Sequence, residues 1–206
     1  MSGLSPPTEA LAAEHRLTER MLAVMEWRVA EMESVGTADV AFIDGAVEFL
    51  RTYAGRCHHG KEEDILFREL ARKPLTAEHR RLLEELTAEH VFSRTTTAQL
   101  VEARTRHAAG QASALAEVIS CLHLFVEFYP KHIAKEEQEF FPSVLNYFTA
   151  AELSWLRAEQ NEFDRRLVHT LYEKAVAAWE LMPSQDSDSG AVAGGGSLPE
   201  PPMALH

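Results

Sequence analysis

One short motif occurs twice in the chain and limits its fold more than any other feature. The first copy, His58 to Glu63, reads His-His-Gly-Lys-Glu-Glu, and the second, His132 to Glu137, reads His-Ile-Ala-Lys-Glu-Glu, 74 residues later. Both copies place a glutamate four residues after a histidine, so on a helix the imidazole and the carboxylate lie on one face, about a turn apart. A single pair at this spacing is usually a surface contact, but two copies in register indicate an internal repeat.

The repeat continues in the segment that precedes each motif. The tripeptide Ala-Glu-His ends at His15 in the first half and at His90 in the second, 75 residues later. The chain therefore reads as a helical hairpin written twice, and each hairpin contributes two histidines and one glutamate.

Helix-period patterning of apolar residues dominates the chain, and no segment alternates at period two for long. Capping residues and helix breakers predict five helices, at residues 8–34, 39–70, 76–107, 112–147 and 149–179. We therefore predict an all-α fold, an up-down-up-down four-helix bundle with an additional C-terminal helix packed outside it.

The predicted domain covers residues 9–182. Residues 1–8 form a flexible N-terminus in this prediction. Residues 183–206 are rich in Gly, Pro and Ser, cannot bury a core and are expected to form a disordered tail.

Composition narrows the class of protein. The chain has 206 residues, and its net charge of −12 argues against nucleic acid as a partner. The N-terminus lacks the parts of a signal peptide, and no run of 18 apolar residues predicts a membrane span. The two cysteines stand in no motif, which suits a reducing compartment. We expect a soluble cytoplasmic protein without a membrane partner, either a monomer or a homodimer.

The repeated His-Glu pairs fall within the apolar stripes of their helices. At about 100° per residue, His58 and Glu62 share a sector with Leu50, Ala54 and Ile65. An unpaired carboxylate in such a sector is costly, so it needs a cation or a proton. Imidazoles and carboxylates that converge from four helices suit a pair of iron, manganese or zinc ions. The alternative among bundles, a ferritin-like di-iron site, requires Glu-x-x-His, which does not occur in the sequence.

The combined pattern resembles the hemerythrin-like (HHE cation-binding) domains over nearly the whole predicted domain. The residues that carry the resemblance are His15, His58, Glu62, His90, His132 and Glu136. The resemblance implies two iron ions, one bound by His15 and His58 and the other by His90 and His132. Glu62 and Glu136 would bridge the irons, together with an oxo, hydroxo or water ligand. Zinc and manganese are the alternative occupants.

The chain departs from the oxygen-carrying hemerythrins, which it otherwise resembles, in two places. Those proteins have His-x3-His on the third helix, where this chain has Leu86, and His-x4-Asp on the fourth, where it has Glu137. The internal repeat favours Glu136 over Glu137 as the ligand. One fewer protein ligand on the second iron should leave more exchangeable positions. Reactivity with small oxidants is therefore expected rather than dioxygen transport.

Several neighbours of the motif residues have expected roles of their own. His59 lies about 100° around the helix from His58 and is expected to face solvent. Lys61 and Lys135 are expected to pair with surface acids.

Tyr129 is either a core tyrosine with a satisfied hydroxyl or a modulator. As a modulator it would donate a hydrogen bond to an iron-bound species or bind the metal itself. Gly60 is expected to mark close packing of a neighbouring helix.

Three functions are compatible with this pattern. The first is a di-iron enzyme that reacts with hydrogen peroxide or dioxygen, with catalase-like peroxide breakdown as the leading activity and Tyr129 as a catalytic modulator. The second is a non-catalytic module that binds or senses oxygen, nitric oxide or iron. The third is a helical bundle whose polar interior holds zinc or no metal.

Overall fold

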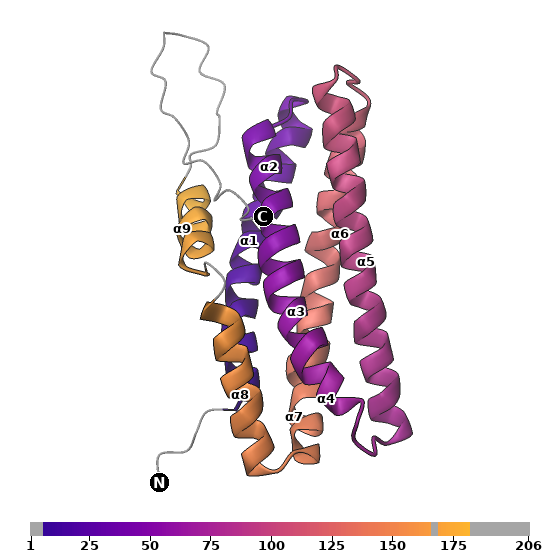
Figure 1. Cartoon of the computed structure of the whole chain (residues 1–206). Coiled ribbons are helices and arrows are strands. Elements are labelled where there is room, and N and C mark those ends of the chain that lie inside the picture. Colours follow the sequence, from indigo (N-terminus) through magenta and orange to yellow (C-terminus); the bar gives the residue numbers. More distant parts are fainter. Residues whose placement is uncertain (1–5, 166–168, 182–206) are drawn as a thin grey trace.

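The computed structural model describes residues 6–165 and 169–181, and the secondary structure in these ranges is helical throughout (Figure 1). In the described ranges, four long helical segments lie side by side along the molecule, and the two helices that follow them in the chain cover one side. This arrangement confirms the predicted all-α bundle with additional C-terminal helical structure. The predicted tail at residues 183–206 lies outside the described residues, as does most of the predicted flexible N-terminus.

The first and third segments are single regular helices. They are α1 (Thr8–Val35) and α5 (Ala77–Ala108). Gly36 ends α1 in the left-handed conformation at φ 72°, which glycine adopts without strain, and its amide donates to the carbonyl of Met32. Thr76 caps α5 by accepting a hydrogen bond from the amide of His79 at 3.2 Å.

The second and fourth segments are helical throughout but contain wide π-helical turns, which the periodicity did not predict. The second consists of α2 (Val40–Glu48), η1 (Phe49–His58), α3 (His59–Lys61), η2 (Glu62–Phe67) and α4 (Arg68–Leu70). The fourth consists of α6 (Ala114–Ala134), η3 (Lys135–Phe140), α7 (Phe141–Val144) and η4 (Leu145–Tyr147), of which η4 is 3-10 helical. The π-helical turns contain His58, Glu62 and Glu136 of the repeated motifs, whereas His132 lies on α6. Such turns often occur at functional sites.

The predicted fifth helix is described as two helices, α8 (Ala150–Arg165) and α9 (His169–Glu180), on either side of residues 166–168. The predicted capping box at its start is confirmed. The Thr149 amide donates to the Glu152 carboxylate at 2.8 Å, and the Glu152 amide donates to the Thr149 hydroxyl at 3.3 Å.

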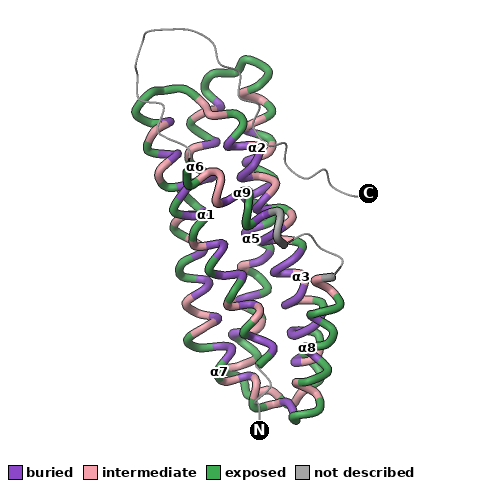
Figure 2. The backbone as a smooth tube through the Cα atoms, turned by 90° about the vertical axis from the view of Figure 1, so that its left-hand side faces the viewer, coloured by how far each residue is buried: buried purple, intermediate pink, exposed green. Residues whose placement is uncertain are grey.

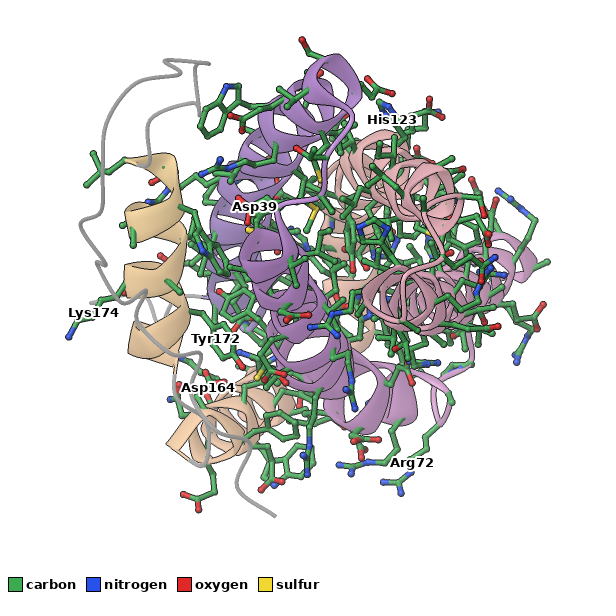
Figure 3. All side chains as sticks on the ribbon, turned by 90° about the horizontal axis from the view of Figure 1, so that it is seen from above. Asp39, Arg72, His123, Asp164, Tyr172 and Lys174 are labelled. Carbon is green, nitrogen blue, oxygen red and sulfur yellow. The ribbon has the colours of Figure 1, made fainter. Side chains whose placement is uncertain are left out.

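Both added helices pack against glycines of the second segment. A Cβ at Gly60 would lie 3.1 Å from Cζ of Phe163 on α8, which agrees with the close packing expected there. A Cβ at Gly45 would collide with the indole of Trp179 on α9. Tyr172 points from α9 toward the bundle, where its hydroxyl donates to Glu48 at 3.1 Å, while Lys174 points away (Figure 3).

The buried residues line the inner faces of the helices (Figure 2) and form two apolar clusters along the bundle. One cluster includes Met21, Leu50 and Phe125, and the other includes Leu11 and Leu86. On each of the four long segments the predicted ligand residues lie between members of the two clusters. A polar layer therefore interrupts the core at one level. Among the described residues, no helix combines the length and apolar character needed to cross a bilayer.

We expect the substitution Gly45→Ala to destabilise the fold by about 1–3 kcal/mol, because the added methyl group overpacks the contact with Trp179. In a Trp179→Ala background the same substitution should become neutral or stabilise by up to about 1 kcal/mol, since alanine is the better helix former. Urea unfolding of the wild type, the two single variants and the double variant measures both effects. An equal loss of unfolding free energy in the two backgrounds would show that contact with the indole of Trp179 is not the reason for glycine at position 45.

Candidate metal centre

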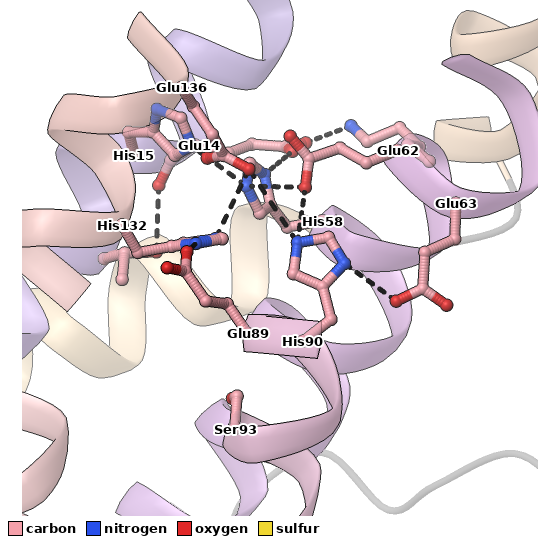
Figure 4. Close-up of polar contacts among 12 residues, drawn as sticks. Glu14, His15, His58, Glu62, Glu63, Glu89, His90, Ser93, His132 and Glu136 are labelled. Carbon is pink, nitrogen blue, oxygen red and sulfur yellow. Dashed lines mark hydrogen bonds and ion pairs between the residues drawn. The ribbon is translucent and has the colours of Figure 1, made fainter. Parts of the chain in front are cut away.

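The structure brings the six predicted ligand residues together at one level of the bundle (Figure 4). They come from all four long segments, and each side chain is at most 3% exposed. We refer to this set as the cage: His15 on α1, His58 on η1, Glu62 on η2, His90 on α5, His132 on α6 and Glu136 on η3.

Each cage glutamate lies between imidazoles from different helices. A carboxylate oxygen of Glu62 is 3.6 Å from Nε2 of His58 and 3.3 Å from Nε2 of His90. Oxygens of Glu136 are 3.0 Å from Nε2 of His15 and 3.3 Å from Nε2 of His132. Each carboxylate thus reaches one imidazole from each half of the repeat, which is the placement that a bridging ligand needs.

Most atoms that face the centre of the cage form no well-aligned hydrogen bond, although they lie 3.0–3.8 Å from one another as ion pairs. Within the described part of the chain this holds for Nε2 of His90 and His132 and for both carboxylate oxygens of Glu62 and Glu136. Nε2 of His15 instead faces Nε2 of His58 at 3.0 Å. Buried polar atoms without partners are rare because they lose their hydration without compensation. The donor set, four imidazole nitrogens and two carboxylates, therefore fits divalent metal ions of the iron, manganese and zinc type.

The opposite nitrogen of every cage histidine, Nδ1, is held by a glutamate carboxylate. The Nδ1–carboxylate distances are 2.8 Å for His15 with Glu137, 3.0 Å for His58 with Glu14, 2.7 Å for His90 with Glu63 and 2.8 Å for His132 with Glu89. A proton on Nδ1 that is donated to a carboxylate leaves the lone pair on Nε2, which is the form that binds metal. We call Glu14, Glu63, Glu89 and Glu137 the outer glutamates.

Each outer glutamate is in turn paired with a cation. The pairs are Glu137 with Arg16, Glu14 with Lys61, Glu63 with Arg94 and Glu89 with Lys135. All four outer glutamates follow the internal repeat, because Glu14 corresponds to Glu89 and Glu63 corresponds to Glu137. The role of Glu137 as a partner of Nδ1 also places its carboxylate on the outer side of His15, away from the centre.

The expectation that Lys61 pairs with surface acids is wrong. Lys61 is fully buried and contacts both Glu14 and Asp164, the latter at 2.7 Å. Helix α8 supplies Asp164 and covers the outer face of the second segment. A position that would be exposed in a four-helix bundle is therefore enclosed in this chain.

The expectation that His59 faces solvent is also wrong. Its side chain is fully buried, and its ring stacks on that of His90 at a centroid distance of 3.9 Å and an angle of 13°. The interior sector of a bundle helix is at least about 100° wide, so two consecutive residues can both point inward. The repeat gives a signal for this placement, because the equivalent residue in the second half is Ile133, which is buried too.

Tyr129 is buried beside the cage, with its ring centroid 6.2 Å from that of His132. Its hydroxyl forms a hydrogen bond with Oγ of Ser93 at 2.9 Å, and burial raises the pKa of its phenol. This is the geometry of a core tyrosine with a satisfied hydroxyl. Its role as a modulator stays a prediction.

Charges within the cage control its protonation. Burial lowers the pKa of His15 and His90, but the nearby negative carboxylates of Glu136 and Glu62 outweigh this effect. They raise the pKa of His15 and bring that of His90 to about 11. Burial favours the neutral form of Glu136, yet the surrounding imidazoles, His132 foremost, hold its pKa well below the usual range. Without metal, protons on His15 and His90 therefore balance part of the negative charge in the cage.

Comparison with protein families gives one match. The model of the hemerythrin HHE cation binding domain matches residues 6–144, a range that contains the whole cage and all four outer glutamates. Comparisons with curated proteins and with solved structures found no match.

We expect the substitution Glu89→Gln to weaken metal binding by about 10- to 100-fold, because His132 loses the charged acceptor that orients its ring. Glu84→Gln, at an exposed position of the same helix, is the matched control. Competition with a chelator of known affinity measures both variants. Equal affinities would show that the outer glutamate does not support its histidine.

We also expect metal binding to release protons at pH 7 and to strengthen as the pH rises. The raised pKa of His90, about 11, means that this imidazole is protonated in the metal-free protein at pH 7, and a metal has to displace that proton. Calorimetric titration in two buffers of different ionisation enthalpy counts the protons released. Identical apparent enthalpies in the two buffers would contradict this expectation.

Proposed function

Because the chain belongs to the hemerythrin HHE cation-binding domain family, we propose that its cage binds two iron ions that react with hydrogen peroxide or dioxygen. Catalase-like breakdown of peroxide is the activity that we propose first. The iron ions, when bound, would supply the redox chemistry, for which the described side chains offer no substitute.

The observation that supports this proposal most strongly is the orientation of the cage atoms. Nε2 of His90 and of His132 and both carboxylates face one another without well-aligned hydrogen bonds among the described residues, and Nε2 of His15 faces Nε2 of His58. Every Nδ1 atom of the cage is held from outside. Such an arrangement is costly in a bundle without metal, since the buried carboxylates are then balanced only by protons on neighbouring imidazoles and several inward-facing atoms keep no hydrogen bond. Two cations would satisfy all of these atoms.

The arrangement favours one division of the ligands. His15 and His58 have their Nε2 atoms 3.0 Å apart and would hold one iron. His90 and His132, whose ring centroids are 5.2 Å apart, would hold the other. Glu62 and Glu136 would then link the two irons, since each lies between imidazoles of both pairs.

The surroundings of the cage limit what can reach it. The cage side chains are at most 3% exposed, and apolar clusters lie on both sides of them along the bundle. Without opening of the bundle, only small molecules such as peroxide, dioxygen or nitric oxide would reach the site. The chain's own residues would orient the ligands, exclude bulk water and hold protons on the Nδ1 atoms.

One experiment separates the proposed functions. The full chain is loaded with iron, its metal content and optical spectrum are measured, and hydrogen peroxide is added while oxygen is recorded. We expect two irons per chain and evolution of oxygen. Two irons with a reversible spectral change on exposure to gas but no turnover would favour the binding or sensing alternative. Less than one iron per chain would contradict the di-iron site.

A pair of adjacent variants tests the assignment of Glu136. Glu136→Gln should leave fewer than two irons per chain, because it removes a carboxylate that both metals share. Glu137→Gln should bind two irons when metal is in excess, with about 10- to 100-fold lower affinity, since Glu137 supports only Nδ1 of His15. The reverse order of effects would assign the ligand to Glu137.

A further inference from the structure

His59 is a buried histidine for which neither the fold nor the cage as proposed provides a use. Its side chain is fully buried, and neither ring nitrogen has a hydrogen-bond partner among the described residues. A buried imidazole normally bonds through at least one nitrogen, because both lose their water on folding. An unpartnered polar side chain inside a metal-binding bundle therefore suggests a ligand that is not a protein group.

The position of His59 identifies which part of the site it serves. One nitrogen each of His59, His90 and His132 can be chosen so that all three lie within 4.8 Å of one another. A separate group with the same spacing consists of His15, His58, Glu62 and Glu136. The ring of His59 lies edge-on to that of His132, at a centroid distance of 5.7 Å, and is stacked on that of His90 at 3.9 Å. Binding of one metal by His59 and His90 would therefore require one of these two rings to rotate.

We propose that His59 is a further protein ligand of the metal ion held by His90 and His132. This inference rests on the proposed di-iron function and adds a seventh ligand to it. The third imidazole would come from the second helical segment, beside His58. The third helix cannot supply it one turn before His90, because Leu86 stands there and packs in an apolar cluster.

The proposal reverses an expectation from the sequence. With six ligands, the metal at His90 and His132 has no more histidines than the other metal, and both keep open positions. With His59, that metal has three imidazoles, while the metal at His15 and His58 has two. The exchangeable positions would then lie mainly on the metal at His15 and His58. The asymmetry is built into the chain, because the repeat has Ile133 at the position equivalent to His59.

The substitution His59→Phe tests the proposal, because phenylalanine keeps a flat ring against His90 but offers no nitrogen. His59→Gln is a second variant with a smaller change in polarity. The matched control is His123→Gln on the outside of α6, where His123 is 47% exposed and contacts Glu33 (Figure 3). Each full-length protein is loaded anaerobically with iron-57, its two affinities are measured by chelator competition, and its Mössbauer spectrum is recorded.

The wild type and His123→Gln should bind two irons and give two distinct iron signals. In His59→Phe and His59→Gln, one iron should bind as before and the other at least about tenfold more weakly, with a change in only one signal. Two irons with unchanged affinities and signals in the His59 variants would overturn the role of His59 and leave the di-iron function intact. A wild type that binds no iron would overturn both.

A structure of the iron-loaded wild type decides the question if neither His59 variant folds. Electron density that joins a ring nitrogen of His59 to the iron at His90 and His132 would support the proposal. An iron there with His59 beyond bonding distance would overturn it.

Discussion

Two carboxylates and four imidazoles share the interior of one helical bundle, and the free energy of burying them is the constraint on which the rest of the structure depends. A buried carboxylate without a partner costs several kcal/mol even after relaxation. Two successive sets of side chains around the cage offset part of this cost. The outer glutamates hold the Nδ1 atoms of the cage, and arginines and lysines hold the outer glutamates. The inward-facing imidazole nitrogens and carboxylate oxygens of the cage remain without hydrogen bonds from these side chains, and they are the donor types that a two-metal site requires.

The internal repeat made much of this predictable. Capping residues and helix breakers predicted the extents of the four long helical segments. The repeat predicted the convergence of the cage residues, because this follows from the spacing of His and Glu. The π-helical turns around the motifs were not predicted, because the capping and breaking residues that locate helix ends do not mark a change of hydrogen-bond pattern within a helix.

The wrong expectations concern residues whose surroundings are set by contacts distant in sequence. Lys61 is enclosed because α8 returns over the second segment and presents Asp164, which no local pattern around Lys61 indicates. His59 is enclosed because the interior sector of its helix admits two consecutive residues. For His59 the repeat does contain a signal. The equivalent residue, Ile133, is apolar and buried, which indicates that position 59 faces the interior.

The central claim is that the cage is built for cations, and the effect of metal on stability tests it most directly. The unfolding free energy of the full chain is measured by urea titration with iron removed and with iron supplied at about 1,000 times its dissociation constant. The account predicts a stabilisation of about 4 kcal/mol for each site that fills. Equal unfolding free energies with and without iron would contradict it.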